Sequence, residues 1–549
     1  MAELVATLAI VFMTAGVVLL FANRLSVSTI PSYIFAGILA GPVIDQLTVL
    51  ALARWGIAFL VFVFGTRLDF RAIRAVFRDS ELATMAQIGI VGPVGFVVAT
   101  LFGFDPLNAV YFAVASTLSS TLVGRNLLER TAGPRLVHDR LASSIHLFDD
   151  LVAIVVLLAI STETYTADTI AATVGYGVIL LVIALVIYRY GFKLLVRLAG
   201  GSTELVLMGS ISVLFAFLAA ADRLGLSIVI GAFAAGIATR RDATDAVEVF
   251  NGIRSLRDFF VAIFAVTVGA LVSVPTLEVA AIALALTGLV LVVNPVIMMF
   301  SLLYEGYDAR TVHLVGIRTS QVSEMSLVLV IEVALIATID QSMFDAIIIA
   351  AATTMSSTSV IQKYGPPLYD TLFSKLIEGR QTTKIDRRSD VDETLQNHVV
   401  IVGYGRQGQR IVETCERYES NYVVIENDPL LWDTLCTQCE NHVRGDALSD
   451  HSWTVANASE AALIVSTADN RPTSEYIMSL DIGADILLRS RSIEQAKKWL
   501  QRGAIYVAVP SLLASDQLID SVEALVGGDA TTEDLREEHL EQLPEYRGG

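Results

Sequence analysis

The sequence predicts an α-helical polytopic membrane domain followed by a soluble α/β domain of Rossmann type. Residues 1–362 form a series of apolar runs, whereas residues 363–549 have the composition of an ordinary soluble domain. Hydrophobic residues make up 54% of the 549 residues, a share typical of membrane proteins. An apolar stretch at residues 397–402 leads directly into a glycine-rich turn, a pattern that favours a nucleotide-binding fold.

The first half contains about thirteen apolar segments of membrane-spanning length. Their connecting loops test the topology, because Arg and Lys accumulate in cytoplasmic loops. With thirteen spans, the basic clusters at residues 67–78, 125–140, 189–197 and 240–257 all fall on one face. We therefore expect a protein of the cell membrane with its N-terminus outside and its C-terminal domain in the cytoplasm.

Two of these segments contain polar runs that favour a broken helix. Segment five (residues 107–124) carries five hydroxyl side chains within residues 116–121, and segment twelve (residues 311–337) is polar over residues 316–326. Hydroxyl side chains compete for backbone hydrogen bonds and interrupt helices. Because the two segments are seven apart, they run in opposite directions, which is typical of inverted-repeat transporters whose site lies where the segments cross. An interfacial loop is the alternative for either segment.

Asp149 and Asp150 stand at the head of an apolar run that extends to residue 158. A carboxylate at bilayer depth costs roughly 2.5–3.5 kcal/mol on insertion scales, and two adjacent carboxylates resist ionising together. Such a pair suits a proton carrier, and its oxygens also suit a hard monovalent cation. The pair therefore indicates a site where protons and cations compete. The alternative is a pair that complements a helix dipole at the membrane interface.

The second half begins with a polar linker, predicted at residues 363–396, and continues with a Rossmann-type domain at residues 397–525. A strand, a GxGxxG turn and a helix follow one another, so that the glycines let the backbone approach a pyrophosphate at the helix N-terminus. An acidic residue ends the second strand and suits ribose hydroxyls, and polar residues follow the next two strands. The predicted nucleotide-binding residues are Gly403, Gly405, Arg406, Gln407, Gly408, Glu426, Asp446 and Thr467.

The charge of the second half excludes nucleic acid as a partner. Of the net charge of −18, −5 falls in residues 1–362 and −13 in residues 363–549, whereas phosphate backbones require a basic face. An acidic surface with few lysines suggests a halophilic source, and a GC-rich genome explains the lysine bias equally well. Cys436 and Cys439 form a single CxxC pair, for which buried thiols are a better interpretation than zinc or a disulfide. Residues 526–549 are expected to form a disordered acidic tail.

Residues 30–42 (IPSYIFAGILAGP) resemble the second-helix motif of the monovalent cation:proton antiporter family, in the branch that includes the Kef potassium-efflux systems. Further motifs of that family are similar, in the same order, to residues 118–121 (LSST), 226–236 (LSIVIGAFAAG), 256–269 (LRDFFVAIFAVTVG) and 320–324 (SQVSE). The resemblance covers residues 4–361. It implies a core domain with two crossed, unwound helices, a dimerisation domain, and elevator-like exchange of a cation for protons.

The resemblance also implies roles for individual residues. Asp150 would be the obligatory ion carrier and Asp149 its partner, as in electrogenic sodium/proton exchangers. Electrogenic relatives tend to have a lysine where this chain has Asn294, so the stoichiometry stays open. His146 is either a pH-responsive neighbour or a structural residue. An ion pair between Arg318 and Glu324, as a structural brace, is the alternative to ion binding by these residues. The expected ion-binding residues are Ser119, Ser120, Thr121, Asp149, Asp150, Asn294, Gln321 and Glu324.

Residues 397–525 resemble the N-terminal lobe of RCK (regulator of potassium conductance) domains. That resemblance implies a homodimer and a regulatory nucleotide, NAD(H) or AMP, with no catalytic cofactor. Taken together, the sequence predicts an antiporter in the lipid bilayer that exchanges Na⁺ or K⁺ for H⁺ under nucleotide control. A ligand-gated potassium-efflux system with channel-like flux is one alternative. A membrane-anchored dinucleotide-dependent enzyme is another, although the chain has no evident substrate domain.

Overall fold

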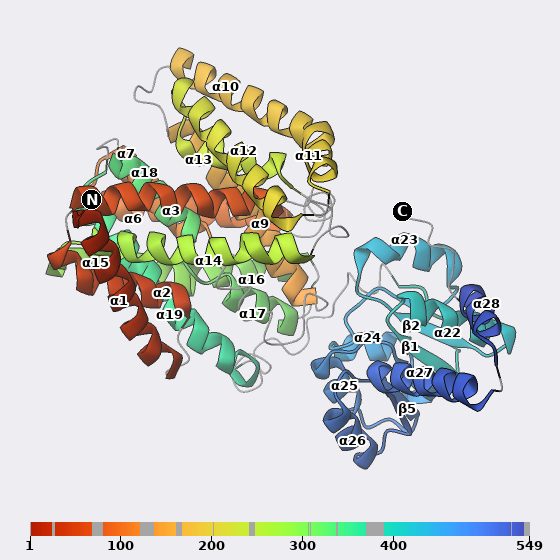
Figure 1. Cartoon of the computed structure of the whole chain (residues 1–549). Helices are drawn as coiled ribbons and strands as arrows, with labels where there is room; N and C mark the ends of the chain where they lie inside the picture. Colours follow the sequence, from red (N-terminus) through yellow and green to blue (C-terminus); the bar gives the residue numbers. More distant parts are fainter. Residues whose placement is uncertain are drawn as a thin grey trace. The chain divides into compact units, whose positions relative to one another are not determined.

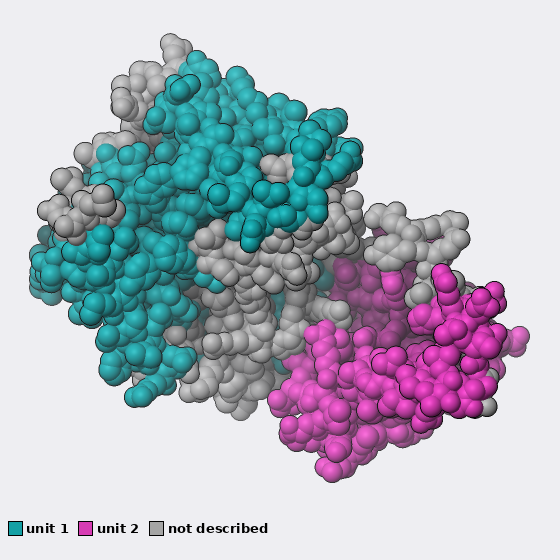
Figure 2. Space-filling model, viewed as in Figure 1, with its two compact units in different colours: residues 1–380 teal, residues 381–549 magenta. Residues whose placement is uncertain are grey.

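The computed structural model describes residues 2–24, 28–44, 46–67, 81–120, 137–160, 167–200, 202–240, 247–305, 307, 309–335, 339–368, 389–392, 394–528 and 530–542. The chain divides into two compact units, Met1–Arg380 and Gln381–Gly549 (Figure 2).

The first unit is built of helices over its described residues (Figure 1). Its α-helices are α1 (Ala2–Arg24), α2 (Thr29–Ala40), α3 (Gln46–Arg67), α5 (Glu81–Ala86), α6 (Gly92–Leu101), α7 (Pro106–Thr117), α9 (Val137–Ile160), α10 (Ala167–Val186), α11 (Phe192–Leu198), α12 (Thr203–Arg223), α13 (Ile228–Ala238), α14 (Val247–Ala270), α15 (Leu277–Gly288), α16 (Asn294–Tyr304), α17 (Ala309–Arg318), α18 (Glu324–Leu335) and α19 (Gln341–Leu368). Within the described residues, seven continuous helices are long and apolar enough to cross a membrane, and three shorter apolar helices accompany them. The predicted count of about thirteen spans therefore stays a prediction.

Both segments predicted to be broken are interrupted where their polar runs lie. Helix α7 ends at Thr117, and Leu118 is already extended. Ser116 and Thr117 donate their hydroxyls to the carbonyls of Ala113 and Val114, which is how such residues compete with helix continuation. Likewise α17 ends at Arg318, and α18 begins only at Glu324.

Three further helices of the described residues contain a π-turn in mid-course. These are η2 (Gln87–Val91) between α5 and α6, η3 (Ile187–Gly191) between α10 and α11, and η4 (Leu289–Val293) between α15 and α16. After η2 and η4 a proline, Pro93 or Pro295, stands two residues beyond the π-turn. Proline lacks the backbone donor and crowds the preceding turn, and the wider π-turn accommodates it without breaking the helix.

Close helix packing in this unit depends on glycine. Cβ atoms added at Gly65 on α3 and Gly236 on α13 would each collide with the backbone of the facing helix, and the same holds for Gly37 on α2 and Gly269 on α14. In a bilayer, where lipid tails are as apolar as leucine, such contacts between backbones are a main source of helix association.

The second unit is a Rossmann-type domain built on one parallel sheet. Its strands are β1 (His398–Val402), β2 (Tyr422–Ile425), β3 (His442–Val443), β4 (Ala461–Ser466), β5 (Asp485–Arg489) and β6 (Tyr506–Ala508), in the spatial order β3-β2-β1-β4-β5-β6. Its α-helices are α22 (Arg406–Arg417), α23 (Pro429–Gln438), α24 (Asp450–Val455), α25 (Arg471–Ile477), α26 (Ile493–Gln501), α27 (Pro510–Gly527) and α28 (Thr532–Gln542). Figure 1 shows the strands enclosed by these helices. The predicted α/β class is confirmed.

Both faces of this sheet are buried, as parallel sheets require. Val400 aligns with Val423 on one side and with Ile464 on the other, and all three belong to one apolar cluster. The neighbouring Ile401 and Val424 point to the opposite face and pack with α22 and α23. The strands therefore have continuous apolar sequences.

The predicted boundaries differ from the structure at two places. The predicted linker at residues 363–396 overlaps both units, because α19 continues to Leu368 and Asp390 forms a β-bridge with His442. The acidic segment 526–549, expected to be disordered, contains α28. A capping box explains this helix: the Asp534 N–H donates to the Thr531 hydroxyl, and the Thr531 N–H donates to the Asp534 carboxylate.

Candidate functional site

The two interrupted segments cross each other in the membrane unit. Ser119 and Val322 form an antiparallel β-bridge, and the Ser323 N–H donates to the carbonyl of Leu118 over 3.1 Å. The Gln321 side chain donates to the carbonyl of Ser120 over 2.9 Å. The Ser120 hydroxyl in turn donates to the carboxylate of Glu324. Four predicted ion-site residues thus meet at the crossing.

Asp149 of the carboxylate pair on α9 faces this crossing. Asp149 and Asp150 are both buried. Oδ2 of Asp149 accepts the Ser119 N–H at 2.9 Å and the Ser119 hydroxyl at 2.5 Å. Nδ1 of His146, one turn earlier on α9, lies 2.9 Å from the same hydroxyl. The Ser119 hydroxyl has a single hydrogen. If Ser119 donates that hydrogen to Asp149, then Nδ1 of His146 must be the donor in its own hydrogen bond with the Ser119 oxygen.

Helix α19 supports the crossing with two hydroxyls that the sequence analysis missed. Thr354 Oγ1 accepts the Val322 N–H at 3.1 Å, and Thr358 Oγ1 donates to the carbonyl of Ser320 at 2.7 Å. These contacts satisfy backbone groups that the broken helix leaves unpaired, which is necessary inside a membrane protein. The available signal was the spacing, because threonines at i and i+4 share one face of a helix.

Gln87 is a second residue that the sequence analysis missed. It lies fully buried in the π-turn η2 and donates its amide to the carbonyl of Thr117 at the end of α7. A buried glutamine in an apolar span is costly unless it has partners. A glutamine within an apolar membrane-spanning segment was therefore the sequence signal that could have identified Gln87.

One expectation about this site is not met. Arg318 does not pair with Glu324 but forms its ion pair with Asp139 near the start of α9. This pairing depends on which helices lie side by side. Asn294 is buried at the start of α16, and its role as an ion ligand stays a prediction. Thr121, the remaining predicted ligand, lies outside the described residues.

In the soluble unit, the predicted nucleotide residues gather at one edge of the sheet. Gly403, Glu426 and Thr467 directly follow β1, β2 and β4, and Asp446 follows β3 by a short turn. Parallel strands present their carboxyl ends at the same edge, where ligands bind in such folds. Arg406 and Gln407 form the exposed first turn of α22, and Gln407 accepts a hydrogen bond from Arg489 at 2.9 Å.

The glycine-rich turn is tightly built. Gly403 has φ +94°, a conformation that favours glycine, and a Cβ on Gly408 would collide with the carbonyl of Gly403. Gly405 is different: no protein atom lies within 4 Å of its added Cβ. The space beside Gly405 is therefore open for a ligand.

Glu426 holds the glycine-rich turn in place. Its Oε2 accepts the Tyr404 N–H at 2.5 Å, and its Oε1 accepts the N–H groups of Asn427 and Asp428, both at 2.7 Å. Burial raises the pKa of Glu426 above its ordinary value, although these amide donors favour the charged form. A direct contact of this carboxylate with ribose stays a prediction. Asp446 is also engaged locally, since its Oδ1 accepts the Leu448 N–H.

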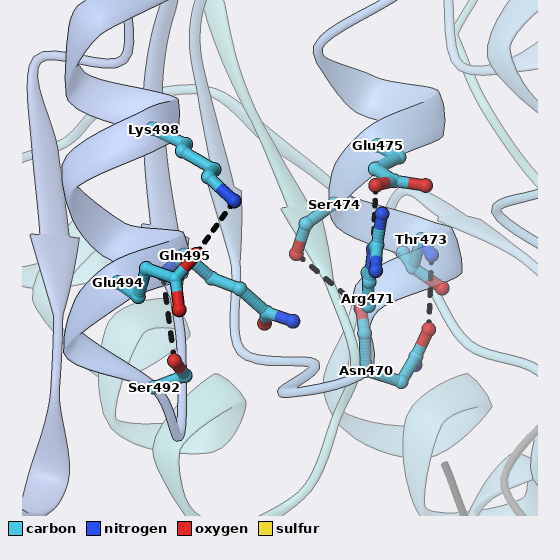
Figure 3. A network of polar contacts seen from close by, with 9 residues as sticks. All are labelled: Asn470, Arg471, Thr473, Ser474, Glu475, Ser492, Glu494, Gln495 and Lys498. Atoms are coloured by element: carbon cyan, nitrogen blue, oxygen red, sulfur yellow. Dashed lines mark hydrogen bonds and ion pairs between the residues drawn. The ribbon is translucent and has the colours of Figure 1, made fainter. Parts of the chain in front are cut away.

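A cavity of about 480 Å³ between α25 and α26 lies apart from the predicted residues (Figure 3). Two of its cations already have partners on their own helices. Arg471 contacts Glu475 at 2.6 Å, and Lys498 contacts Glu494 at 2.7 Å. Such exposed i,i+4 pairs typically contribute a few tenths of a kcal/mol to helix stability. The two ion pairs therefore stabilise α25 and α26, and they give no reason to assign a ligand to this cavity.

Two crossed, unwound helices beside buried carboxylates, joined to a Rossmann-type domain, define a multi-pass membrane transporter rather than an enzyme. The family model "Sodium/hydrogen exchanger, transmembrane" matches residues 8–363, more than half of the chain, and the chain belongs to that family. A second model, the TrkA-N domain, matches residues 399–510. The chain is thus a cation/proton antiporter with an RCK-type regulatory domain.

Relatives and a solved structure are similar over long stretches. The chain is 24% identical to a "Putative K(+) efflux antiporter KefB" of Alkalimonas amylolytica, over 89% of this chain and 76% of that protein. It is 23% identical to the "Putative cation/proton antiporter YbaL" of Escherichia coli, over 96% of this chain and 99% of that protein. The solved sodium proton antiporter MjNhaP1 of Methanocaldococcus jannaschii aligns with 67% of this chain and 99% of its own, at 15% identity and a TM-score of 0.49.

Proposed function

We propose that this chain exchanges one monovalent cation, Na⁺ or K⁺, for protons by alternating access, with Asp150 as the obligatory carrier and Asp149 as its partner. The observation that carries this proposal is the contact between Asp149 and Ser119, where a buried carboxylate meets the unwound backbone at the crossing. Unwound segments offer carbonyls and helix ends to an ion at membrane depth. Ser120, Thr121, Gln321 and Glu324 are the further candidates for its ligands.

The protonation state of Asp149 is coupled to His146 through one hydroxyl. When Asp149 is ionised, Ser119 donates to it and His146 Nδ1 donates to Ser119. When Asp149 is protonated, its O–H donates to Ser119, whose hydroxyl then turns toward an unprotonated His146 Nδ1. His146 would thus stabilise one orientation of this chain of hydrogen bonds. In this arrangement it is a structural residue and also a neighbour that responds to the protonation of Asp149.

Two features favour different cations. The adjacent aspartates resemble the pair of electrogenic sodium/proton exchangers, whereas Asn294 stands where those proteins have lysine. KefB is described as a potassium-efflux antiporter, which supports K⁺ for this chain. The proposed topology retains about thirteen spans, an external N-terminus and a cytoplasmic soluble domain.

The test is ion flux in proteoliposomes that contain a pH dye, with Na⁺ or K⁺ added at a clamped membrane potential. Saturable exchange with Na⁺ that grows with the imposed potential supports electrogenic sodium exchange. Potential-independent exchange, or a response to K⁺ alone, supports the potassium-efflux branch. Cation flux without proton movement would overturn the proposal in favour of channel-like flux.

We further propose that NAD(H) or AMP binds at Gly403–Gly408 and regulates transport. The support is the glycine-rich turn at the N-terminus of α22, which offers backbone N–H groups to a phosphate, together with the open space beside Gly405. A nucleotide shifts transport only if it binds the transport states with different affinity.

A homodimer is proposed through α27 of the soluble unit. This helix has no buried residue, and six of its large apolar side chains form a stripe that is at least 40% exposed: Leu512, Leu518, Ile519, Val522, Leu525 and Val526. Ser521 and Ala524, which lie off the stripe, are partly buried. A self-complementary stripe of this kind suits a second copy of the chain across a two-fold axis.

Cysteine cross-linking tests this dimer. In full-length protein in detergent, Val522→Cys is expected to form covalent dimers on mild oxidation, because equivalent residues of the stripe lie close to the two-fold axis. Gln517→Cys, exposed on the same helix but off the stripe, is the matched control and is expected to stay largely monomeric on a denaturing gel. Equal cross-linking of both variants, or of neither, would contradict this interface.

A further inference from the structure

Cys436 lies in a cluster of side chains that the proposed transport function does not use. It is partly exposed near the end of α23, whereas Cys415 and Cys439 are buried. Nη2 of Arg444 donates to its sulfur over 2.6 Å, and Nε2 of His442 lies 3.4 Å from the same sulfur. A cation and a base therefore meet at one accessible thiol.

The hydrogen bonds of His442 determine which nitrogen faces the thiol as a base. Nδ1 lies 3.1 Å from the carbonyl oxygen of Cys439. A carbonyl only accepts, so Nδ1 carries the hydrogen and Nε2 presents a lone pair to Cys436. Burial lowers the pKa of His442, with Arg444 acting in the same direction, which favours the neutral ring. This is the arrangement of a nucleophile, a base and a group that orients the base.

The charge of Arg444 is directed at the sulfur. The guanidinium of Arg444 lies over the ring of Trp432, with its carbon 5.9 Å from the ring centroid, while its Nη2 donates to the sulfur. The remaining titratable groups around the cluster are Asp390, which faces His442 from the neighbouring segment, and Cys439 on the helix end. A guanidinium beside a thiol stabilises the thiolate, which is the reactive form.

We propose that Cys436 is a reactive thiol and a modification site that forms mixed disulfides with low-molecular-weight disulfides. The thiolate sulfur attacks one sulfur of the small disulfide, and a bond to Cys436 forms as the original S–S bond breaks. The departing thiolate takes a proton from water. Cys436 is oxidised and the small disulfide is reduced, and an added dithiol reverses the step.

The location gives this modification a route to the rest of the domain. A group attached to Cys436 displaces Arg444, which stands two residues before Asp446 at the carboxyl edge of the sheet. Helix α23 also contacts the glycine-rich turn, since the Tyr404 hydroxyl donates to Gln438 over 2.8 Å.

The test uses full-length protein in detergent and the aromatic disulfide 5,5′-dithiobis(2-nitrobenzoate), with the released thiolate followed by absorbance. One of the three cysteines is expected to react at least about tenfold faster at pH 7 than an ordinary thiol of a peptide. Cys436→Ser removes that fast phase, and Cys415→Ser, the matched control, keeps it. A wild-type reaction no faster than the peptide would overturn the proposal.

Variants of Arg444 separate reactivity from mere exposure. Arg444→Gln is expected to slow the fast phase about tenfold at pH 6.5 and much less at pH 9, where any thiol ionises, and Arg444→Lys restores most of the rate. Equal effects at both pH values would overturn the role of the cation. If Arg444→Gln unfolds, mass spectrometry finds Cys415 and Cys439 modified as well. The role of the cation is then judged from Arg444→Lys, which is expected to keep most of the wild-type rate.

Discussion

Replacing Asp150 by asparagine is expected to reduce proton-coupled cation exchange to background, a loss of at least about 100-fold, which is the order that a positioned acid–base group supplies. The amide keeps the shape of the side chain but can neither bind the transported proton nor offer the cation a negative charge. The measurement is cation-dependent pH change in proteoliposomes that contain equal amounts of protein.

The matched control for this prediction is Glu278→Gln, which neutralises an exposed carboxylate in the first turn of α15. It is expected to transport like the wild type. If Asp150→Asn exchanged protons for cations as fast as the control, Asp150 would not be the carrier, and Asp149 would have to be tested in its place.

Changing Gly405 to alanine is expected to weaken nucleotide binding by a factor of ten or more, which corresponds to about 1.4 kcal/mol or above. Gly405 has φ −67° and no protein atom within 4 Å of the added Cβ, so alanine fits the folded domain without strain. Any loss therefore comes from crowding between the new methyl group and the bound phosphate. The measurement is the rise in thermal stability of the full-length protein on addition of NADH or AMP.

Gly483→Ala is the matched control, because its added Cβ also meets no protein atom and it lies between α25 and β5, away from the turn. This variant is expected to bind nucleotide like the wild type. Unchanged binding in Gly405→Ala would show that the phosphates do not approach this part of the turn. A fall in the stability of the nucleotide-free protein would instead indicate a structural role for Gly405.

The two predictions probe separate parts of one regulated transporter. Asp150→Asn is expected to leave nucleotide binding intact, since the glycine-rich turn belongs to the other unit. Gly405→Ala is expected to leave basal exchange intact and to remove only the response to nucleotide. Reciprocal loss of both activities in either variant would show that the two units do not fold or act independently.

The sequence by itself determined the features that depend on local composition. The contrast between apolar and polar halves predicted the two units, because burial in lipid requires long apolar runs. The hydroxyl run before Thr121 predicted that α7 would end early, since competition for backbone hydrogen bonds is local. The order of strand, glycines and helix around Gly403 predicted the Rossmann-type turn for the same reason.

Only the tertiary structure decided which side chains from distant segments meet. Thr354 and Thr358 reach the crossing from another helix, Arg318 pairs with Asp139 rather than Glu324, and Cys436 meets Arg444 across a turn. Periodicity identifies the helix face on which a residue lies, but the packing of the helices determines which residues contact that face. The physical reason is that a buried polar group must find a partner wherever packing places one, and no local pattern in the chain records that choice.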